Sequence, residues 1–174
     1  MPDDSEVIRV VKEFCFQNVF ERKTQGGVDR DDYKQSWRDH AKKVKGVEVK
    51  EEGLTKFTTL AIQDEVQRKF GILDIARERK VEGSSQLSFD LWNTTEGTAL
   101  EICLGPIKNE FEKDVLKGIL DRETTKLVIF FREYGYGTAG NTYGKRFFEQ
   151  PAQREIMDRA SIYKLKVVPI SLIL

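Results

Sequence analysis

Two acidic residues lie in apolar surroundings, and their types and positions suggest metal-dependent chemistry. Asp90 lies in the segment SFDLW, and Glu101 lies in the apolar run ALEICL of residues 99–104. An ionised carboxylate in such a strand is costly unless it is paired or binds a cation. Two carboxylates that converge suit Mg²⁺, which completes its octahedral shell with waters and a substrate phosphate. The alternative is that both side chains lie on the solvent-exposed face of a hairpin.

The other reactive residue types are few, which leaves the chemistry to carboxylates and lysines. The single histidine, His40, cannot build a His-rich metal site, and a catalytic triad would have to use it from within an amphipathic helical segment. Cys15 and Cys103 are far apart and form no CxxC pair, which excludes a zinc ribbon and a redox motif. We expect Cys15 to be a small buried residue.

A β-hairpin would position the two carboxylates. Residues 87–91 alternate apolar and polar side chains, residues 93–97 are rich in turn-forming types, and residues 98–104 are almost all apolar. With a rise of about 3.3 Å per residue, a turn at 93–97 brings Asp90 roughly opposite residues 100–101. The spacing therefore predicts that the two carboxylates converge.

The rest of the chain supplies the elements around this hairpin. Apolar spacing predicts two helices within the first 45 residues and a third over 56–70, capped by Thr55. After the hairpin the pattern predicts a helix over 107–120, a central strand over 126–131, a helix over 147–161 and a strand over 163–172. Pro169 near the end of this last strand favours an edge position for it. We expect a single α/β domain over residues 1–174.

This order of elements and the motif within it resemble a known family. Asp90, ten residues, Glu101, one residue, Cys103, then a helix and a central strand are similar to the PD-(D/E)XK nuclease superfamily, which has the restriction-endonuclease-like fold. The resemblance implies a mixed sheet with an α-β-β-β-α-β-α-β core over residues 55–174, counting a short strand near 72–75 or 80–82. Residues 1–50 would then be a helical N-terminal extension.

The resemblance also implies an activity. It is the metal-dependent hydrolysis of phosphodiester bonds in DNA or RNA, with Mg²⁺ or Mn²⁺ held by Asp90 and Glu101. The helix before the hairpin often adds a carboxylate in this superfamily, and Asp64 and Glu65 are the candidates. A lysine would stabilise the attacking hydroxide or the charge on the phosphate.

The chain departs from the family pattern at the lysine. Cys103 occupies that position, and a thiol in an apolar strand stays neutral and cannot replace an ammonium. Either the cation has moved to another element, for which Lys108 is the best candidate and Lys113 a weaker one, or the site is degenerate. In the second case the chain is a catalytically inactive restriction-endonuclease-like module that binds nucleic acid or a partner protein.

A glycine- and tyrosine-rich segment, residues 134–145, is a second candidate for function. Tyr136, Tyr143, Lys145 and Arg146 combine aromatic rings with cations, a composition that suits stacking on bases and contacts with phosphates. The alternative is an ordinary surface loop. It is not a P-loop, because no GxxxxGK[ST] occurs in the chain.

Composition adds weaker expectations about partners and compartment. The chain of 174 residues has a formal net charge of zero, so no global attraction to nucleic acid follows. No apolar run is long enough to cross a membrane, the first residues do not resemble a signal peptide, and the two separated cysteines suggest a reducing, cytoplasmic compartment. From the habits of the fold we expect a homodimer that acts on nucleic acid, on DNA more than RNA.

Overall fold

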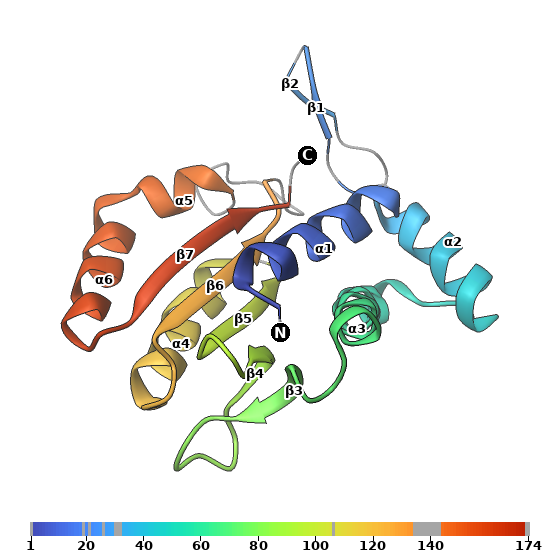
Figure 1. Cartoon of the computed structure of the whole chain (residues 1–174). Helices are drawn as coiled ribbons and strands as arrows, with labels where there is room; N and C mark the ends of the chain where they lie inside the picture. The colour runs from blue at the N-terminus through green and yellow to red at the C-terminus, as the bar shows by residue number, and fades with distance from the viewer. Residues whose placement is uncertain are drawn as a thin grey trace.

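The chain forms one α/β domain built on a five-stranded mixed sheet (Figure 1). The structure is a computed structural model, and it describes residues 2–18, 20, 22–25, 27–29, 33–105, 107–133 and 144–172. The single α/β domain with a mixed sheet is the fold class that the sequence predicts.

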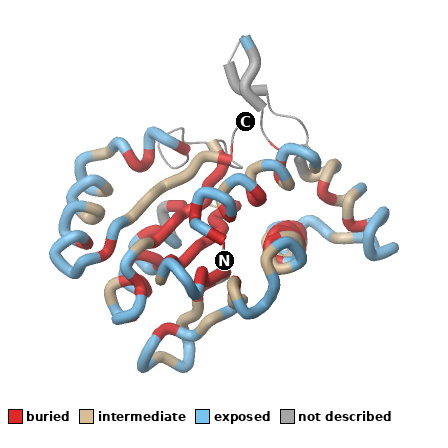
Figure 2. Tube along the Cα trace, in the orientation of Figure 1, coloured by how far each residue is buried: buried red, intermediate tan, exposed pale blue. Residues whose placement is uncertain are grey.

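The strands follow one another across the sheet in chain order. They are β3 (Ile75–Lys80), β4 (Ser88–Asn93), β5 (Thr98–Cys103), β6 (Lys126–Phe131) and β7 (Lys166–Ser171). The pairs β3–β4 and β4–β5 are antiparallel, whereas β5–β6 and β6–β7 are parallel. All six residues of β5 are buried, because β5 is central and covered on both faces (Figure 2).

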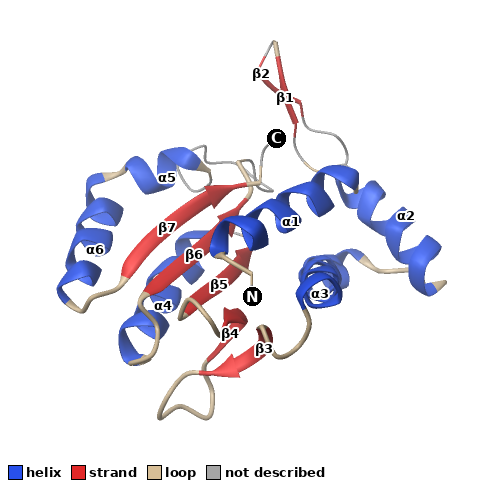
Figure 3. Cartoon of the chain, viewed as in Figure 1, coloured by secondary structure: helices blue, strands red, loops and turns tan. Residues whose placement is uncertain are grey.

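Helices cover both faces of this sheet (Figure 3). The helices are α1 (Asp4–Gln17), α2 (Tyr33–Lys45), α3 (Glu51–Phe70), α4 (Ile107–Leu120), α5 (Lys145–Glu149) and α6 (Pro151–Ile162). One hydrophobic core joins α1, α2 and α3 to one face of the sheet, and a second joins α4, α5 and α6 to the other face. Between α1 and α2 the chain forms a small hairpin of β1 (Arg22–Thr24) and β2 (Gly27–Asp29).

Residues of β5 alternate between the two cores, as the period of a strand requires. Leu100 and Ile102 belong to the core under α1 and α3, whereas Ala99 and Cys103 belong to the core under α4. Glu101 lies between Ala99 and Cys103 on the α4 side, where it bonds to Lys117 of that helix. This alternation places the one acidic side chain of β5 on the face that α4 covers.

Several element boundaries differ from those predicted. Helix α3 begins at Glu51, not near residue 56, and Thr55 lies inside it, because the extended Lys50 is the N-cap. The strand expected near 72–75 or 80–82 is β3, which begins at the end of the first segment and ends at the start of the second. The predicted helix over 147–161 is two helices, since Gln150 is extended and Pro151 starts α6. The hairpin β1–β2 was not predicted.

Pro169 lies on an edge strand, as predicted. The N–H groups of Lys166 and Leu172 donate to the carbonyls of Thr125 and Phe131. The backbone N–H groups of even-numbered residues of β7 therefore point toward β6, and those of odd-numbered residues point away from it. Pro169 therefore faces the open edge, where its missing N–H removes a donor that another strand could pair with.

Both cysteines are free and buried, which confirms the expectation for Cys15. Within the described part of the chain, no helix combines the length and apolar character needed to cross a membrane.

Candidate active site

The strands β4 and β5 stop pairing at the level of the two candidate carboxylates. The last paired residues are Leu91 and Leu100, and extending this antiparallel register by one step places Asp90 opposite Glu101. At that step Asp90 Oδ2 accepts a hydrogen bond of 2.8 Å from the N–H of Ile102. The Asp90 carboxylate therefore satisfies a β5 donor that the ladder leaves without a strand partner.

The neighbouring strand is irregular at the same level. Glu78 of β3 lies opposite Asp90 but does not pair with it, although the residues before and after Glu78 pair with β4. Its φ of 49° is uncommon for a residue other than glycine. The buried amide of Gln63 on α3 donates to Glu78 Oε1 at 3.2 Å and to the carbonyl of Asp90 at 3.1 Å. Helix α3 thus stabilises the break in the sheet through Gln63, a residue that the sequence did not single out.

Lys117 of α4 is the cation that meets Glu101. Its Nζ bonds to the Glu101 carboxylate, to Asp114 Oδ1 at 2.8 Å and to the carbonyl of Ser88 at 3.0 Å. The side chains of Lys117, Glu101 and Asp114 are 5%, 6% and 3% exposed, so this ion cluster lies almost entirely inside the domain. Asp114 Oδ2 also accepts a hydrogen bond of 3.3 Å from the thiol of Cys103.

The carboxyl groups at this place outnumber the ammonium that they surround only in part, and burial shifts their pKa values. Burial raises the pKa of Asp90 to about 6, although the hydrogen bond from Ile102 and the charge of Lys117 oppose this. Burial, then the charges of Asp114 and Asp90, raise the pKa of Glu101. Burial opposes the charged form of Lys117, but the carboxylates of Glu101 and Asp114 outweigh it and raise its pKa, so Lys117 stays protonated. A further cation would favour the ionised forms of these carboxyl groups, which burial disfavours.

The geometry of α4 explains why Lys117 reaches Glu101. Helix α4 connects two parallel strands, so it runs antiparallel to β5, and its 14 residues span about 21 Å, against about 20 Å for the 6 residues of β5. Glu101 is therefore level with the middle of α4, near Asp114. Because helical side chains lean toward the N-terminus, Lys117 reaches back to this level.

Of the other lysines proposed for this role, Lys113 has a different partner, and Lys108 stays a prediction. Lys108 belongs to the first turn of α4, which is level with the end of β5, and its side chain lies outside the described residues. Lys113 pairs with Glu110 on the exposed side of α4.

The acidic residues proposed on α3 bind arginines instead of joining the Asp90–Glu101 pair. The Glu65 carboxylate accepts two hydrogen bonds from Arg68, at 2.7 and 2.9 Å. Asp64 is half exposed and pairs with Arg77 of β3. Gln63, their neighbour, is the α3 residue that contacts Asp90.

Only part of the proposed nucleic-acid-binding segment can be placed. Tyr136 and Tyr143 lie outside the described residues. Lys145 and Arg146 are exposed in α5, where the Lys145 N–H donates to Glu133 Oε1 at 3.2 Å and its ammonium lies 3.8 Å from Glu149.

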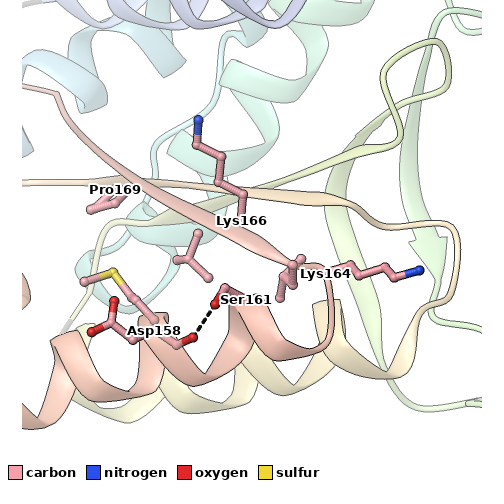
Figure 4. A pocket seen from close by; sticks show the side chains of 8 residues that line it. Asp158, Ser161, Lys164, Lys166 and Pro169 are labelled. Atoms are coloured by element: carbon pink, nitrogen blue, oxygen red, sulfur yellow. Dashed lines mark hydrogen bonds between the residues drawn. The ribbon is translucent and has the colours of Figure 1, made fainter.

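A groove of about 520 Å³ lies elsewhere, between α6 and the open edge of β7 (Figure 4). The Ser161 hydroxyl donates to the Asp158 carbonyl at 2.5 Å, and the ammonium ends of Lys164 and Lys166 point away from the apolar floor (Figure 4). None of the groove residues belongs to the ion cluster.

The oxygen donors of the cluster suit a hard divalent cation. Among the described residues no group of three or more His, Cys, Asp or Glu is arranged to hold a metal ion. Mg²⁺ is usually held by only one or two carboxylates, with waters and substrate phosphate. Asp90 and Glu101 meet this need, since Asp90 Oδ1 and Glu101 Oε2 accept no hydrogen bond from a described residue.

No family model matches the chain, and no similar curated protein or solved structure was found.

Proposed function

We propose that this protein is a metal-dependent nuclease, with Asp90, Glu101 and Lys117 as its active site. The observation that carries the proposal is the convergence of two carboxylates and one ammonium from three elements, β4, β5 and α4, at a break in the sheet. These are the functional groups that metal-assisted phosphodiester hydrolysis requires.

The arrangement of elements supports the same proposal. From α3 onward the chain runs α-β-β-β-α-β, then α5 and α6, then β7, and the sheet is antiparallel at one side and parallel at the other. This order is compatible with a restriction-endonuclease-like core, with α1, β1, β2 and α2 as an N-terminal addition.

Each residue of the site has a distinct task. A bound Mg²⁺ or Mn²⁺ would polarise the scissile phosphate and lower the pKa of an attacking water. Asp90 and Glu101 would hold that cation through their free oxygens. Lys117, kept protonated by the surrounding carboxylates, would stabilise the negative charge that develops on the phosphate. Burial raises the pKa of the Cys103 thiol, so Cys103 stays neutral and cannot do so.

DNA is the proposed substrate ahead of RNA, and exposed cations beside Glu133, just after β6, support a polyanionic ligand. Lys145 and Arg146 lie at the start of α5, after the segment that leaves the carboxyl end of β6. Phosphate contacts by such side chains would add affinity without sequence preference.

A second candidate is the inactive module that binds nucleic acid or a partner protein. It is favoured by the ion pairs that Lys117 forms with both Glu101 and Asp114, because these three side chains are nearly buried and already paired with one another.

A cleavage assay separates the two candidates. Labelled single- and double-stranded DNA and RNA are incubated with the full chain and Mg²⁺, Mn²⁺ or EDTA. We expect cleavage that requires the divalent cation and falls by about 100-fold or more in Asp90→Asn, Glu101→Gln and Lys117→Met. Lys113→Met, an exposed lysine of the same helix, is the matched control and should cleave normally. Absence of cleavage under every condition would favour the inactive module.

A further inference from the structure

We infer that Asp114 is a positioning residue for Lys117, and that the thiol of Cys103 holds Asp114 in the orientation this requires. The role concerns the ammonium of the proposed active site, and so it rests on the proposed function. It gives Cys103, at the position of the motif lysine, a task of its own.

The contacts of Lys117 show why a positioning residue is needed. A lysine side chain has four flexible carbons and three ammonium donors. Those donors meet three acceptors from three elements: Glu101 of β5, Asp114 of α4 and the carbonyl of Ser88 in β4. A cation that bound Glu101 would weaken the first of these contacts. Asp114 and the Ser88 carbonyl would then hold the ammonium in place.

Asp114 itself is fixed through both carboxylate oxygens. Oδ1 binds Lys117 at 2.8 Å, and Oδ2 accepts a hydrogen bond from Cys103 Sγ at 3.3 Å. Asp114 and Cys103 are 2% and 8% exposed, so water does not readily replace either partner. Rotation of the carboxylate would therefore break one of its two bonds, and the thiol sets the direction in which Asp114 points.

The same geometry predicts where a lysine at position 103 would place its charge. Cys103 Sγ already contacts Asp114, and the longer, flexible side chain of a lysine at this position would have the same carboxylate within reach of its ammonium. Moving the cation back, in the double variant Cys103→Lys/Lys117→Met, should therefore restore part of the activity that Lys117→Met alone removes.

Two readouts test the positioning role in the full-length protein. The first is Mn²⁺-dependent cleavage, in which Asp114→Asn should lower kcat by about 10- to 100-fold and change KM little. Cys103→Ala should act in the same direction, whereas Cys103→Ser, which keeps a donor, should retain activity. The second is the ¹H–¹⁵N signal of the Lys117 ammonium, whose protons exchange slowly only while it is held. That signal should weaken in Asp114→Asn and Cys103→Ala.

The controls keep this test separate from that of the proposed function. Glu110→Gln, an exposed acidic change on the same helix, should alter neither readout. If the wild-type protein cleaves nothing, the proposed function fails, while the ammonium signal still tests the positioning role. Should Asp114→Asn fail to fold, the comparison of Cys103→Ala with Cys103→Ser decides. Unchanged kcat and an unchanged Lys117 signal in Asp114→Asn, or in Cys103→Ala, would overturn the inference.

Discussion

At the scale of single residues, the site is a buried cluster in which several carboxylates share one ammonium. Asp90, Glu101 and Asp114 all have raised pKa values, with burial as the largest cause in each. Such a cluster is a poor source of stability, because the cost of burying charge offsets much of the attraction. Its persistence in the interior therefore favours a functional role.

Replacing Asp90 should stabilise the fold in a pH-dependent way. Burial raises the pKa of Asp90 from 3.8 to about 6, so the folded state binds the proton more tightly and loses stability as pH rises from about 4 to 6. Asp90→Asn can still accept the hydrogen bond from Ile102, and it should add up to about 3 kcal/mol to the free energy of unfolding at pH 7.

Urea denaturation of both proteins from pH 4 to 8 measures this effect. As pH falls toward 4 and below, the wild-type carboxyl becomes protonated in the unfolded state as well, so the difference should shrink toward zero. A difference that is constant across the range would contradict the raised pKa.

Replacing Lys117 should destabilise the fold. Lys117→Met leaves the nearly buried carboxylates of Glu101 and Asp114 without their counter-charge, and the expected loss is about 3–5 kcal/mol in the free energy of unfolding. Lys113→Met removes an exposed pair with Glu110 on the same helix and should cost at most about 1 kcal/mol. If urea denaturation gave the same loss of free energy of unfolding for both changes, the buried ion cluster would contribute no more to stability than the exposed pair.

The sequence predicted part of this site, for reasons that are local. Asp90 and Glu101 are level because a short turn sets the register of a hairpin, and that turn is visible in residue types. Lys117 was missed because its relation to Glu101 depends on the length and direction of a helix packed on the sheet. The combination of its position one turn after Asp114 and the lean of helical side chains toward the N-terminus was the available signal.

At the scale of elements, the close packing of α4 decides whether this arrangement forms. A Cβ at Gly118 would lie 2.7 Å from Cδ2 and 3.1 Å from Cδ1 of the buried Leu165, which precedes β7. Gly118 is one residue after Lys117. The close approach of α4 to Leu165 therefore also fixes the position of Lys117 relative to Glu101 on the sheet.

Two glycine-to-alanine changes measure the importance of this close approach. Gly118→Ala should lower the free energy of unfolding by about 1–3 kcal/mol, because Leu165 must move. Gly53→Ala, in the first turn of α3, meets only Val49 Cγ1 at 3.7 Å and should raise it by up to about 1 kcal/mol through helix propensity. Thermal or urea unfolding gives both values, and a stabilising Gly118→Ala would contradict tight packing there.

Element boundaries were predicted unevenly, because different forces decide them. The edge position of β7 followed from Pro169, whose missing N–H is a local property. The start of α3 did not follow from Thr55, because the extended Lys50 is the N-cap without a side-chain bond, and Glu51 pairs with Lys34 of α2. Pro151 was the local signal that α5 and α6 are separate helices.

At the scale of the whole molecule, a chain with no net charge gathers carboxyl groups at one place. The formal net charge is zero, whereas Lys117 binds the buried Glu101 and Asp114, and the partly buried Asp90 lies beside Glu101. Binding of a divalent cation, more than attraction of the whole surface to a polyanion, is therefore the step on which the proposed function depends. Nucleic acid as partner and a homodimer as assembly stay predictions, which sedimentation velocity and the cleavage assay test.

The most direct test is a calorimetric titration of Mn²⁺ into the full chain, alone and with a phosphorothioate DNA duplex that resists cleavage. We predict binding that Asp90→Asn and Glu101→Gln each abolish and that Glu110→Gln, an exposed control on α4, leaves intact. No binding with or without the duplex, or binding that survives both changes, would contradict the assignment of Asp90 and Glu101 as metal ligands.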